Sequence, residues 1–244
     1  MIGSFLLWTW VWLWGTCCAI AGGILFIIFN PLVDPKRVVV SYASMAWAKG
    51  IMLVLPGIPI EVTGNQYLRE PLMLCPNHNS VSDMIMLMAA LPRLKFVAKW
   101  PLFYVPPLAF QLRAAGYVQG GVGEDGAVSR VIGGCAKWLA RGCHMVWFPE
   151  YTRSPDGEVQ RFKQGPFVAA KQAGVRIAPV AITGTRQVLG NKSLRYHFKV
   201  QVKIDILEPL TVADDPKETA KLARQRVIQA LEARKTAAVA KAAA

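Results

Sequence analysis

The feature that most constrains the fold is a stretch of 25 residues without a charged side chain, from Phe5 to Phe29. A helix that rises about 1.5 Å per residue would cover roughly 37 Å here, more than the ~30 Å hydrocarbon core of a bilayer. A secretory signal peptide is the alternative, but it predicts a basic segment before a shorter apolar core. The first charged residue is Asp34, so we predict a membrane-embedded helix.

Four tryptophans alternate along this stretch: Trp8, Trp10, Trp12 and Trp14. On a helix they form two ridges on roughly opposite sides, which is typical of the headgroup region of a membrane. Pro31 and Pro35 then break the helix, two basic residues follow, and a second apolar stretch runs from Val38 to Leu55. The pair predicts either a spanning helix followed by a surface helix, or a hairpin that enters one leaflet. In both layouts the basic residues place the rest of the chain on the cytoplasmic side of the inner membrane.

The 244-residue chain has a net charge of +13, which is unevenly distributed. Residues 1–70 contribute +1 and the remaining residues +12. A basic body behind an apolar N-terminus suits an anionic membrane surface, where each nearby Lys or Arg adds about 1 kcal/mol. Nucleic-acid binding is the competing interpretation, and charge alone does not decide. Because the basic residues are scattered, we expect a membrane partner and no nucleic acid.

Cysteine and glycine motifs argue against metal and dinucleotide sites. The five cysteines show no Cys-x-x-Cys spacing, and the three histidines lie far from any paired cysteines. We therefore predict reduced thiols, no metal and no cofactor. Gly121–Gly126 matches Gly-x-Gly-x-x-Gly, but Glu124 and Asp125 would set negative charge beside a pyrophosphate. We predict a crossover loop at this position.

After Pro59, short β-rich stretches alternate with helical ones. This alternation predicts an α/β fold, a central β-sheet core flanked by helices, behind an N-terminal membrane-embedded two-helix segment. The predicted strands are Ile60–Val62, Leu72–Cys75, Lys95–Ala98, Gly116–Gln119, Met145–Phe148, Ile177–Ile182 and Val200–Ile206. The predicted helices are Asp83–Ala90, Leu102–Leu112, Ala127–Ala140, Pro166–Ala173 and Pro216–Ala233. We divide the chain into anchoring helices at 1–56, a globular domain at 57–233 and an Ala/Lys-rich tail at 234–244 that we expect to be frayed.

The stretch PNHNSVSDMIM, residues 76–86, sets a histidine and an aspartate five positions apart. Five residues at about 100° each separate side chains by ~140° around a helix. His78 and Asp83 can therefore meet only if His78 lies in a turn and Asp83 in the helix that follows. An aspartate on one ring nitrogen leaves the other able to accept a proton from a hydroxyl. The chain has no Gly-x-Ser-x-Gly motif, so we expect that hydroxyl to belong to the substrate.

A second polar cluster, FPEYTRSPDG at residues 148–157, follows a predicted strand. Ligands bind at the carboxyl ends of strands in α/β sheets. An arginine beside hydroxyl groups can hold a phosphate there through its planar fork, so Arg153 is a candidate phosphate ligand. The alternative is a solvated turn with an ion pair between Glu150 and Arg153.

These motifs together resemble the 1-acyl-sn-glycerol-3-phosphate acyltransferase (lysophosphatidic acid acyltransferase) family of the glycerolipid acyltransferases. Its His-x-x-x-x-Asp block, preceded by Asn, and its Phe-Pro-Glu-x-Thr-Arg-Ser block both occur here. Between them KWPLFYVP matches Lys-x-x-Leu-x-x-x-Pro, and after them IAPVAI matches Val/Ile-Pro-Val/Ile. Four motifs in the family's order, over about residues 72–186, make the resemblance specific.

The resemblance implies transfer of a fatty acyl group from acyl-CoA or acyl carrier protein to the sn-2 hydroxyl of lysophosphatidic acid, which makes phosphatidic acid for phospholipid synthesis. The donor is then a co-substrate, and the globular domain is catalytic. His78 would be the general base and Asp83 its orienting partner. Phosphate binding would fall to Lys99, Glu150, Thr152 and Arg153. Pocket shaping would fall to Asn79, Ser80, Tyr151, Ser154 and Pro179.

Two departures from the family pattern lie at the expected headgroup site. Tyr151 replaces the family's glycine between Glu and Thr, and Gly120 and Gly121 stand where the family has an arginine. The acceptor could therefore be another lysolipid, for example a lyso-aminolipid. A thioesterase or lysolipid hydrolase, with the same pair activating water, and a non-catalytic lipid-binding protein remain as alternatives. A phosphate pocket favours the transferase over the hydrolase, and the intact His78–Asp83 pair argues against the non-catalytic class.

Overall fold

The chain folds around a mixed β-sheet in the computed structural model, which describes residues 2–29, 32–54, 58–106, 108–121, 126–190, 195–197 and 199–243. The strands are β1 (Ile60–Thr63), β2 (Leu72–Pro76), β3 (Leu94–Lys99), β4 (Val118–Gly120), β5 (His144–Val146), β6 (Arg176–Thr183) and β7 (Val202–Ile206). Within the described residues they form one seven-stranded sheet in the order β1-β7-β6-β2-β5-β3-β4. Neighbouring strands are parallel except for β6 and β7, which are antiparallel.

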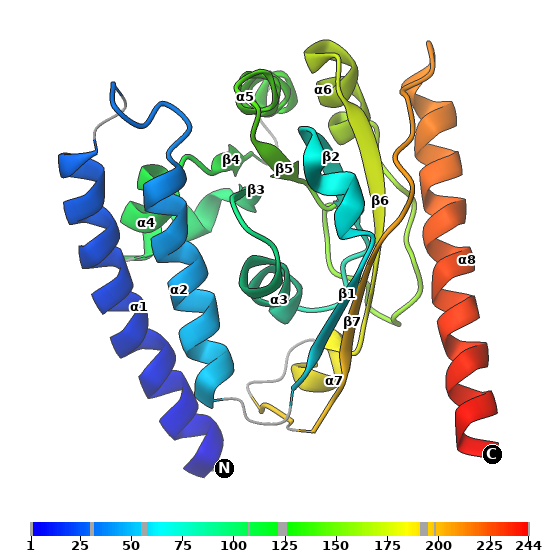
Figure 1. Cartoon of the computed structure of the whole chain (residues 1–244), viewed down its shortest axis with the longest axis horizontal. Coiled ribbons are helices and arrows are strands. Elements are labelled where there is room, and N and C mark those ends of the chain that lie inside the picture. Colours follow the sequence, from blue (N-terminus) through cyan, green and yellow to red (C-terminus); the bar gives the residue numbers. More distant parts are fainter. Residues whose placement is uncertain are drawn as a thin grey trace.

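Helices cover both faces of the sheet (Figure 1). They are α1 (Ile2–Ile28), α2 (Val38–Val54), α3 (Ser82–Ala90), α4 (Leu108–Ala114), α5 (Ala127–Ala140), α6 (Gly165–Ala173), α7 (Thr185–Val188) and α8 (Pro216–Ala243), with 3-10 turns η1 (Asn65–Arg69) and η2 (Trp100–Tyr104). Helices α1 to α4 lie on one side of the sheet, and α5, α6 and α8 lie on the other. The predicted α/β class is confirmed.

Each face of the sheet has its own apolar core because side chains alternate along a strand. In β2, Leu72 and Leu74 belong to the core beneath α1 to α4, whereas Met73 and Cys75 belong to the core beneath α5, α6 and α8. All four side chains are fully buried. A central strand covered on both faces needs apolar residues at every position, which explains why this strand is so clear in the sequence.

Helices α1 and α2 run side by side in opposite directions (Figure 1). The indole N–H groups of Trp10 and Trp14 donate to the α2 carbonyls of Gly50 (3.1 Å) and Ala46 (3.2 Å). A Cβ atom added to Gly50 would lie 1.9 Å from Nε1 of Trp14, so glycine permits this close approach. Two of the four alternating tryptophans therefore join the helices to each other.

Helix α1 is, among the described residues, the one helix long and apolar enough to cross a membrane. Its apolar part covers Phe5–Ile28 with a mean hydropathy of 2.1, and the apolar part of α2, Val38–Leu53, is shorter. Large apolar side chains stay exposed along α1: Phe5, Leu6, Leu13, Ile20, Ile24, Ile27 and Ile28. This face indicates membrane association. The side-by-side packing suits the predicted hairpin, while the depth of insertion stays a prediction.

A buried lysine joins the start of α2 to the sheet. Lys95 in β3 is 1% exposed, and burial lowers its pKa to about 8. Its ammonium group donates to the carbonyls of Arg37 (3.1 Å) and Ala115 (2.7 Å) and to the hydroxyl of Ser41 (2.7 Å). A buried ammonium group is stable only when its donors are satisfied, so this contact holds the helix pair in one position on the body.

The structure corrects two secondary-structure predictions. The predicted helix Leu102–Leu112 is wrong as one element, since η2 and α4 are separate. A proline disfavours a helical conformation of the residue before it, and Val105, which precedes Pro106, is extended. At the C-terminal end of the chain, α8 continues to Ala243, ten residues beyond the predicted helix end at Ala233. Arg234 pairs with Asp205 and Glu61, and alanine has the highest helix propensity. The 1–56 and 57–233 division stays a prediction.

Candidate active site

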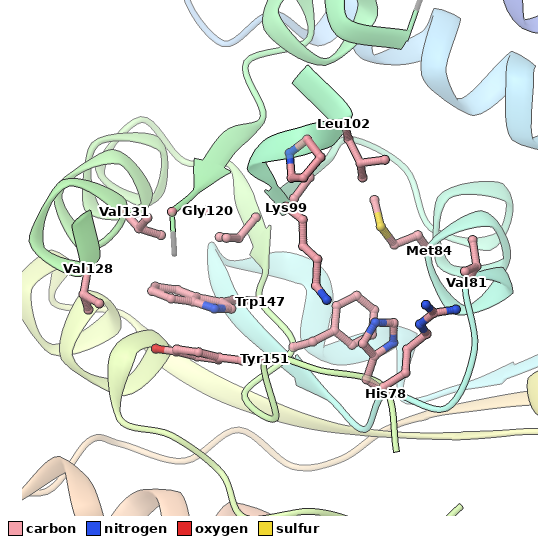
Figure 2. A pocket seen from close by; sticks show the side chains of 16 residues that line it. His78, Val81, Met84, Lys99, Leu102, Gly120, Val128, Val131, Trp147 and Tyr151 are labelled. Atoms are coloured by element: carbon pink, nitrogen blue, oxygen red, sulfur yellow. The ribbon is translucent and has the colours of Figure 1, made fainter. Parts of the chain in front are cut away.

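A cavity of about 340 Å³ lies at the carboxyl ends of four parallel strands (Figure 2). Its lining includes His78 just after β2, Lys99 at the end of β3, Gly120 at the end of β4 and Trp147 just after β5. Parallel strands end at the same edge of a sheet, where α/β proteins bind ligands. The topology therefore brings together residues that are far apart in the chain.

His78 and Asp83 are in contact, as their spacing predicted. His78 lies in the turn after β2, Asp83 lies in the first turn of α3, and Nδ1 of the imidazole is 2.8 Å from Oδ2 of the carboxylate. The same oxygen accepts the backbone N–H groups of Asn79 (2.7 Å) and Ser80 (2.8 Å). An ionised carboxylate only accepts hydrogen bonds, so Nδ1 carries the proton and Nε2 is left as the acceptor.

The segment after β5 fixes the backbone of His78 from both sides. The N–H of His78 donates to Oε1 of Glu150 (2.9 Å), and its carbonyl accepts the N–H of Ser154 (2.8 Å). The ring of Phe148 stacks on the imidazole with centroids 4.1 Å apart. The two sequence motifs are thus parts of one structural unit, because the second positions the histidine of the first.

Glu150 has a different contact from the one that the resemblance suggested. Its side chain is 4% exposed, and its carboxylate accepts the N–H groups of His78 and Gln160. Burial raises its pKa to about 7, although the two N–H donors act in the opposite direction. Glu150 is not among the described residues that line the cavity. These contacts make it a residue that positions His78.

The two predicted cations both line the cavity. Lys99 and Arg153 are exposed residues of the lining, and the side chain of Lys99 points into the cavity toward His78 (Figure 2). Thr152 is exposed and Pro179 is buried in β6, and neither is in the described lining. The phosphate-binding roles stay predictions.

Of the remaining residues predicted to shape the pocket, three form hydrogen bonds in or next to the turn that contains His78. Asn79 and Ser80 donate to Asp83, and the hydroxyl of Ser80 donates to the carbonyl of Leu189 (2.6 Å). The hydroxyl of Ser154 donates to Asp156 (2.8 Å). Hydrogen bonds therefore hold the turn, and the pocket-shaping roles stay predictions.

Tyr151 lines the cavity directly, at its other end from Val81, Met84 and Leu102 (Figure 2). Its φ of 64° is left-handed, a conformation that glycine adopts without strain, which accounts for glycine in the family pattern. Its ring stacks on Trp147 with centroids 5.7 Å apart. Gly120 also lines this end, where the family has an arginine. Among the described residues that line the cavity, Lys99 is therefore the one lysine and Arg153 the one arginine.

Apolar residues of the lining were missed as site residues, among them Val81, Met84 and Leu102. Val81 and Met84 are three positions apart, the spacing of one helix face, and they follow His78 directly. That spacing was the available signal. The GVGEDG loop lies mostly outside the described residues.

The fold and site define an α/β protein that holds a histidine–aspartate pair and two cations around one cavity. The model of the Acyltransferase family matches residues 59–183, and the chain belongs to this family. The matched span contains His78, Asp83, Lys99 and Arg153. The family prediction is confirmed.

The curated relatives carry one common activity in their names. The chain is similar to 1-acyl-sn-glycerol-3-phosphate acyltransferase LPAT1, chloroplastic, of Arabidopsis thaliana: 28% identical over 190 residues, which are 74% of this chain and 53% of that protein. It is also similar to 1-acyl-sn-glycerol-3-phosphate acyltransferase beta of Homo sapiens: 28% identical over 189 residues, 74% of this chain and 68% of that protein. The chain spans about half the length of the plant relatives that it matches.

A crystal structure has the same fold. The 1-acyl-sn-glycerophosphate (LPA) acyltransferase PlsC of Thermotoga maritima aligns with 96% of this chain and 97% of its own, with a TM-score of 0.78 and 23% sequence identity. The alignment covers nearly the whole chain, so the overall arrangement described above is also that of the solved protein.

Proposed function

We propose that the chain transfers a fatty acyl group from a thioester donor to the sn-2 hydroxyl of lysophosphatidic acid and thereby forms phosphatidic acid. The observation that carries this proposal is the His78–Asp83 pair facing a cavity that Lys99 and Arg153 also line. The names of the relatives support the same reaction.

The imidazole acts as the general base. Nε2 of His78 takes the proton of the sn-2 hydroxyl while the alcohol oxygen attacks the thioester carbonyl carbon, forming the C–O bond. The C–S bond then breaks, and the imidazolium returns the proton to the leaving thiolate. Asp83 holds Nδ1–H throughout and stabilises the positive charge that develops on the ring.

Lys99 and Arg153 bind the phosphate of the acceptor in this proposal. Two cations, Lys99 at the end of β3 and Arg153 in the segment after β5, can fix a phosphate while its glycerol hydroxyl lies at the imidazole. A hydrolase that uses water has no need of such a site. Gly120 and Tyr151 line the end of the cavity opposite Val81, where they replace the family's arginine and glycine. This replacement favours a lyso-aminolipid as a second candidate acceptor.

The donor is acyl-CoA or acyl carrier protein, and the setting is the cytoplasmic face of the inner membrane. The exposed apolar face of α1 and the net charge of +13 support attachment to an anionic bilayer surface. Basic residues between α1 and α2 support the cytoplasmic side.

The test is to incubate purified protein with a labelled acyl thioester and an equimolar pool of lysolipids, and to identify the products by mass spectrometry. Labelled phosphatidic acid as the main product supports the proposal. A labelled diacyl aminolipid as the main product would replace lysophosphatidic acid as the acceptor. Labelled free fatty acid alone would show a thioesterase and contradict acyl transfer.

A further inference from the structure

A short helix beside the catalytic turn contacts both sequence motifs of the site. Helix α7 follows β6 and packs against α3. The hydroxyl of Ser80 donates to the carbonyl of Leu189, just after α7 (2.6 Å), and the hydroxyl of Ser82 donates to the carbonyl of Thr185 (3.0 Å). Both serines are fully buried. These hydrogen bonds fix α7 against the turn that contains His78.

The arginine of α7 contacts the second motif. Nη1 of Arg186 donates to the carbonyl of Ser154 (3.2 Å), and Nη2 donates to the carbonyl of Pro155 (2.7 Å). A guanidinium group presents its donors in a rigid planar fork. One side chain therefore holds two consecutive carbonyl groups in a single geometry.

These two carbonyl groups belong to a turn that directly follows Arg153. Within the turn, the hydroxyl of Ser154 donates to Asp156 (2.8 Å) and accepts the N–H of Gly157 (2.9 Å). Gly157 has a left-handed φ of 98°, which glycine adopts without strain. The turn is thus closed by its own hydrogen bonds, and Arg186 ties it to α7.

The same turn also touches the backbone of the histidine, because the N–H of Ser154 donates to the carbonyl of His78 (2.8 Å). Helix α7 is therefore joined to the histidine turn through Ser80 and Ser82, and to the segment that carries Arg153 through Arg186. The separation between the imidazole and the guanidinium group of Arg153 depends on these contacts.

From this arrangement we infer that Arg186 is a positioning residue of the acceptor site. It holds the backbone that carries Arg153, so that one acceptor molecule meets the guanidinium group with its phosphate and His78 with its hydroxyl. The inference rests on the proposed function. Arg186 is not among the described residues that line the cavity, so it acts through Arg153. His78 has two other supports, Glu150 and Asp83, so loss of Arg186 should displace the cation more than the base.

The variants Arg186→Ala and Arg186→Lys test the inference, with Arg226→Ala as the matched control. Arg226 is also partly buried and donates to a backbone carbonyl, that of Glu208 (3.4 Å), but it lies in α8 on the opposite face of the sheet from α3. Initial rates are measured over ranges of lysophosphatidic acid and donor, in the wild-type and Arg153→Ala backgrounds. Without donor, calorimetry measures acceptor binding, and mass spectrometry follows hydrogen exchange in residues 152–158.

In the wild-type background, Arg186→Ala should raise the KM and the dissociation constant for the acceptor about fivefold, roughly the value of one net hydrogen bond. The donor KM and kcat should stay within about twofold of wild type, which also shows that the variant is folded. Arg186→Lys should give an intermediate acceptor KM, because lysine keeps the charge and loses the fork. Residues 152–158 should exchange faster in Arg186→Ala than in wild type or Arg226→Ala.

The double variant separates positioning of Arg153 from a general structural role. In the Arg153→Ala background, Arg186→Ala should raise the acceptor KM by less than about twofold, because the cation that it positions is already absent. Fully additive effects, equal rises in the acceptor KM and the donor KM, or unchanged hydrogen exchange would each overturn the inference. A wild-type protein that transfers no acyl group to lysophosphatidic acid would refute the proposed function. Hydrogen exchange and acceptor binding, both measured without donor, would then still decide whether Arg186 positions Arg153.

Discussion

Replacing Asp83 with asparagine separates the charge of the pair from its geometry. The backbone N–H groups of Asn79 and Ser80 both point at Oδ2 of Asp83. They would therefore orient the amide oxygen of an asparagine toward them and toward Nδ1 of His78. The amide nitrogen would take the place of Oδ1, a buried atom with no hydrogen-bond partner in the described structure. The His78 ring should keep its tautomer and lose only the negative charge beside it.

The lost charge sets the expected size of the effect. Two unit charges about 4 Å apart attract by roughly 4 kcal/mol at an effective dielectric constant of 20. This attraction acts only when the ring becomes an imidazolium, in the transition state, so at about 1.4 kcal/mol per decade kcat should fall roughly a thousandfold. The acceptor KM should stay near its wild-type value, because Asp83 is fully buried and absent from the described lining of the cavity.

The assay is the initial rate of acyl transfer to lysophosphatidic acid over a range of acceptor concentrations, with thermal unfolding as the check on folding. Asp214→Asn is the matched control, because Asp214 is exposed and makes a surface ion pair with Lys171. A kcat for Asp83→Asn within about tenfold of wild type would refute the assigned role, since positioning without charge would then suffice.

Three further perturbations test other parts of the account. Arg153→Ala should raise the acceptor KM about tenfold and leave the donor KM unchanged. Arg69→Ala, at the opposite edge of the sheet, is the control and should change neither KM. If Arg153→Ala raises the acceptor KM and the donor KM equally, Arg153 does not belong to the phosphate site. Burial raises the pKa of Glu150 from 4.5 to about 7, so the stability due to its protonated form is complete below pH 4.5 and lost as the pH rises toward 7. Between pH 4.5 and pH 7 the free energy of unfolding of wild type, measured by denaturant titration, should therefore fall by roughly 3 kcal/mol more than that of Glu150→Gln. If the unfolding free energies of the two proteins change in parallel with pH, the burial argument is contradicted. Gly50→Ala should lower the unfolding free energy by about 1–3 kcal/mol, because its Cβ displaces an indole of α1. Gly133→Ala in α5, with open space around it, should be neutral or stabilising, and the reverse order of melting temperatures would refute the packing argument.

The elements that sequence predicted best are those decided by local pattern. Strand β2 was predicted to within one residue, because its unbroken apolar run fits a strand buried on both faces. Strand β5 ends two residues earlier than predicted, at Val146, and β4 begins two residues later, at Val118. Pairing with neighbouring strands sets such ends, and the local pattern does not contain that information. The turns η1 and α7 are too short to show a periodic pattern.

The same distinction holds for the site. The contact between His78 and Asp83 could be predicted because it is local, over five positions. The hydrogen bond from the backbone N–H of His78 to Glu150 joins residues 72 positions apart. Glu150 lies in the motif that was expected to bind phosphate, and nothing in that motif indicated that its carboxylate would accept backbone N–H groups. The packing of α1 on α4 and of α2 on α3 joins segments that are far apart in the chain, and no single stretch of sequence specifies it.

The central claim is that the imidazole of His78 removes the proton of a lipid hydroxyl. The most direct measurement is the rate of phosphatidic acid formation by His78→Ala in vesicles that contain anionic lipid, with vesicle binding measured in the same sample. We predict that kcat falls by about two to four orders of magnitude, the usual contribution of a general base, while vesicle binding equals that of wild type. A variant that binds vesicles normally and keeps more than a few per cent of wild-type turnover would contradict this claim.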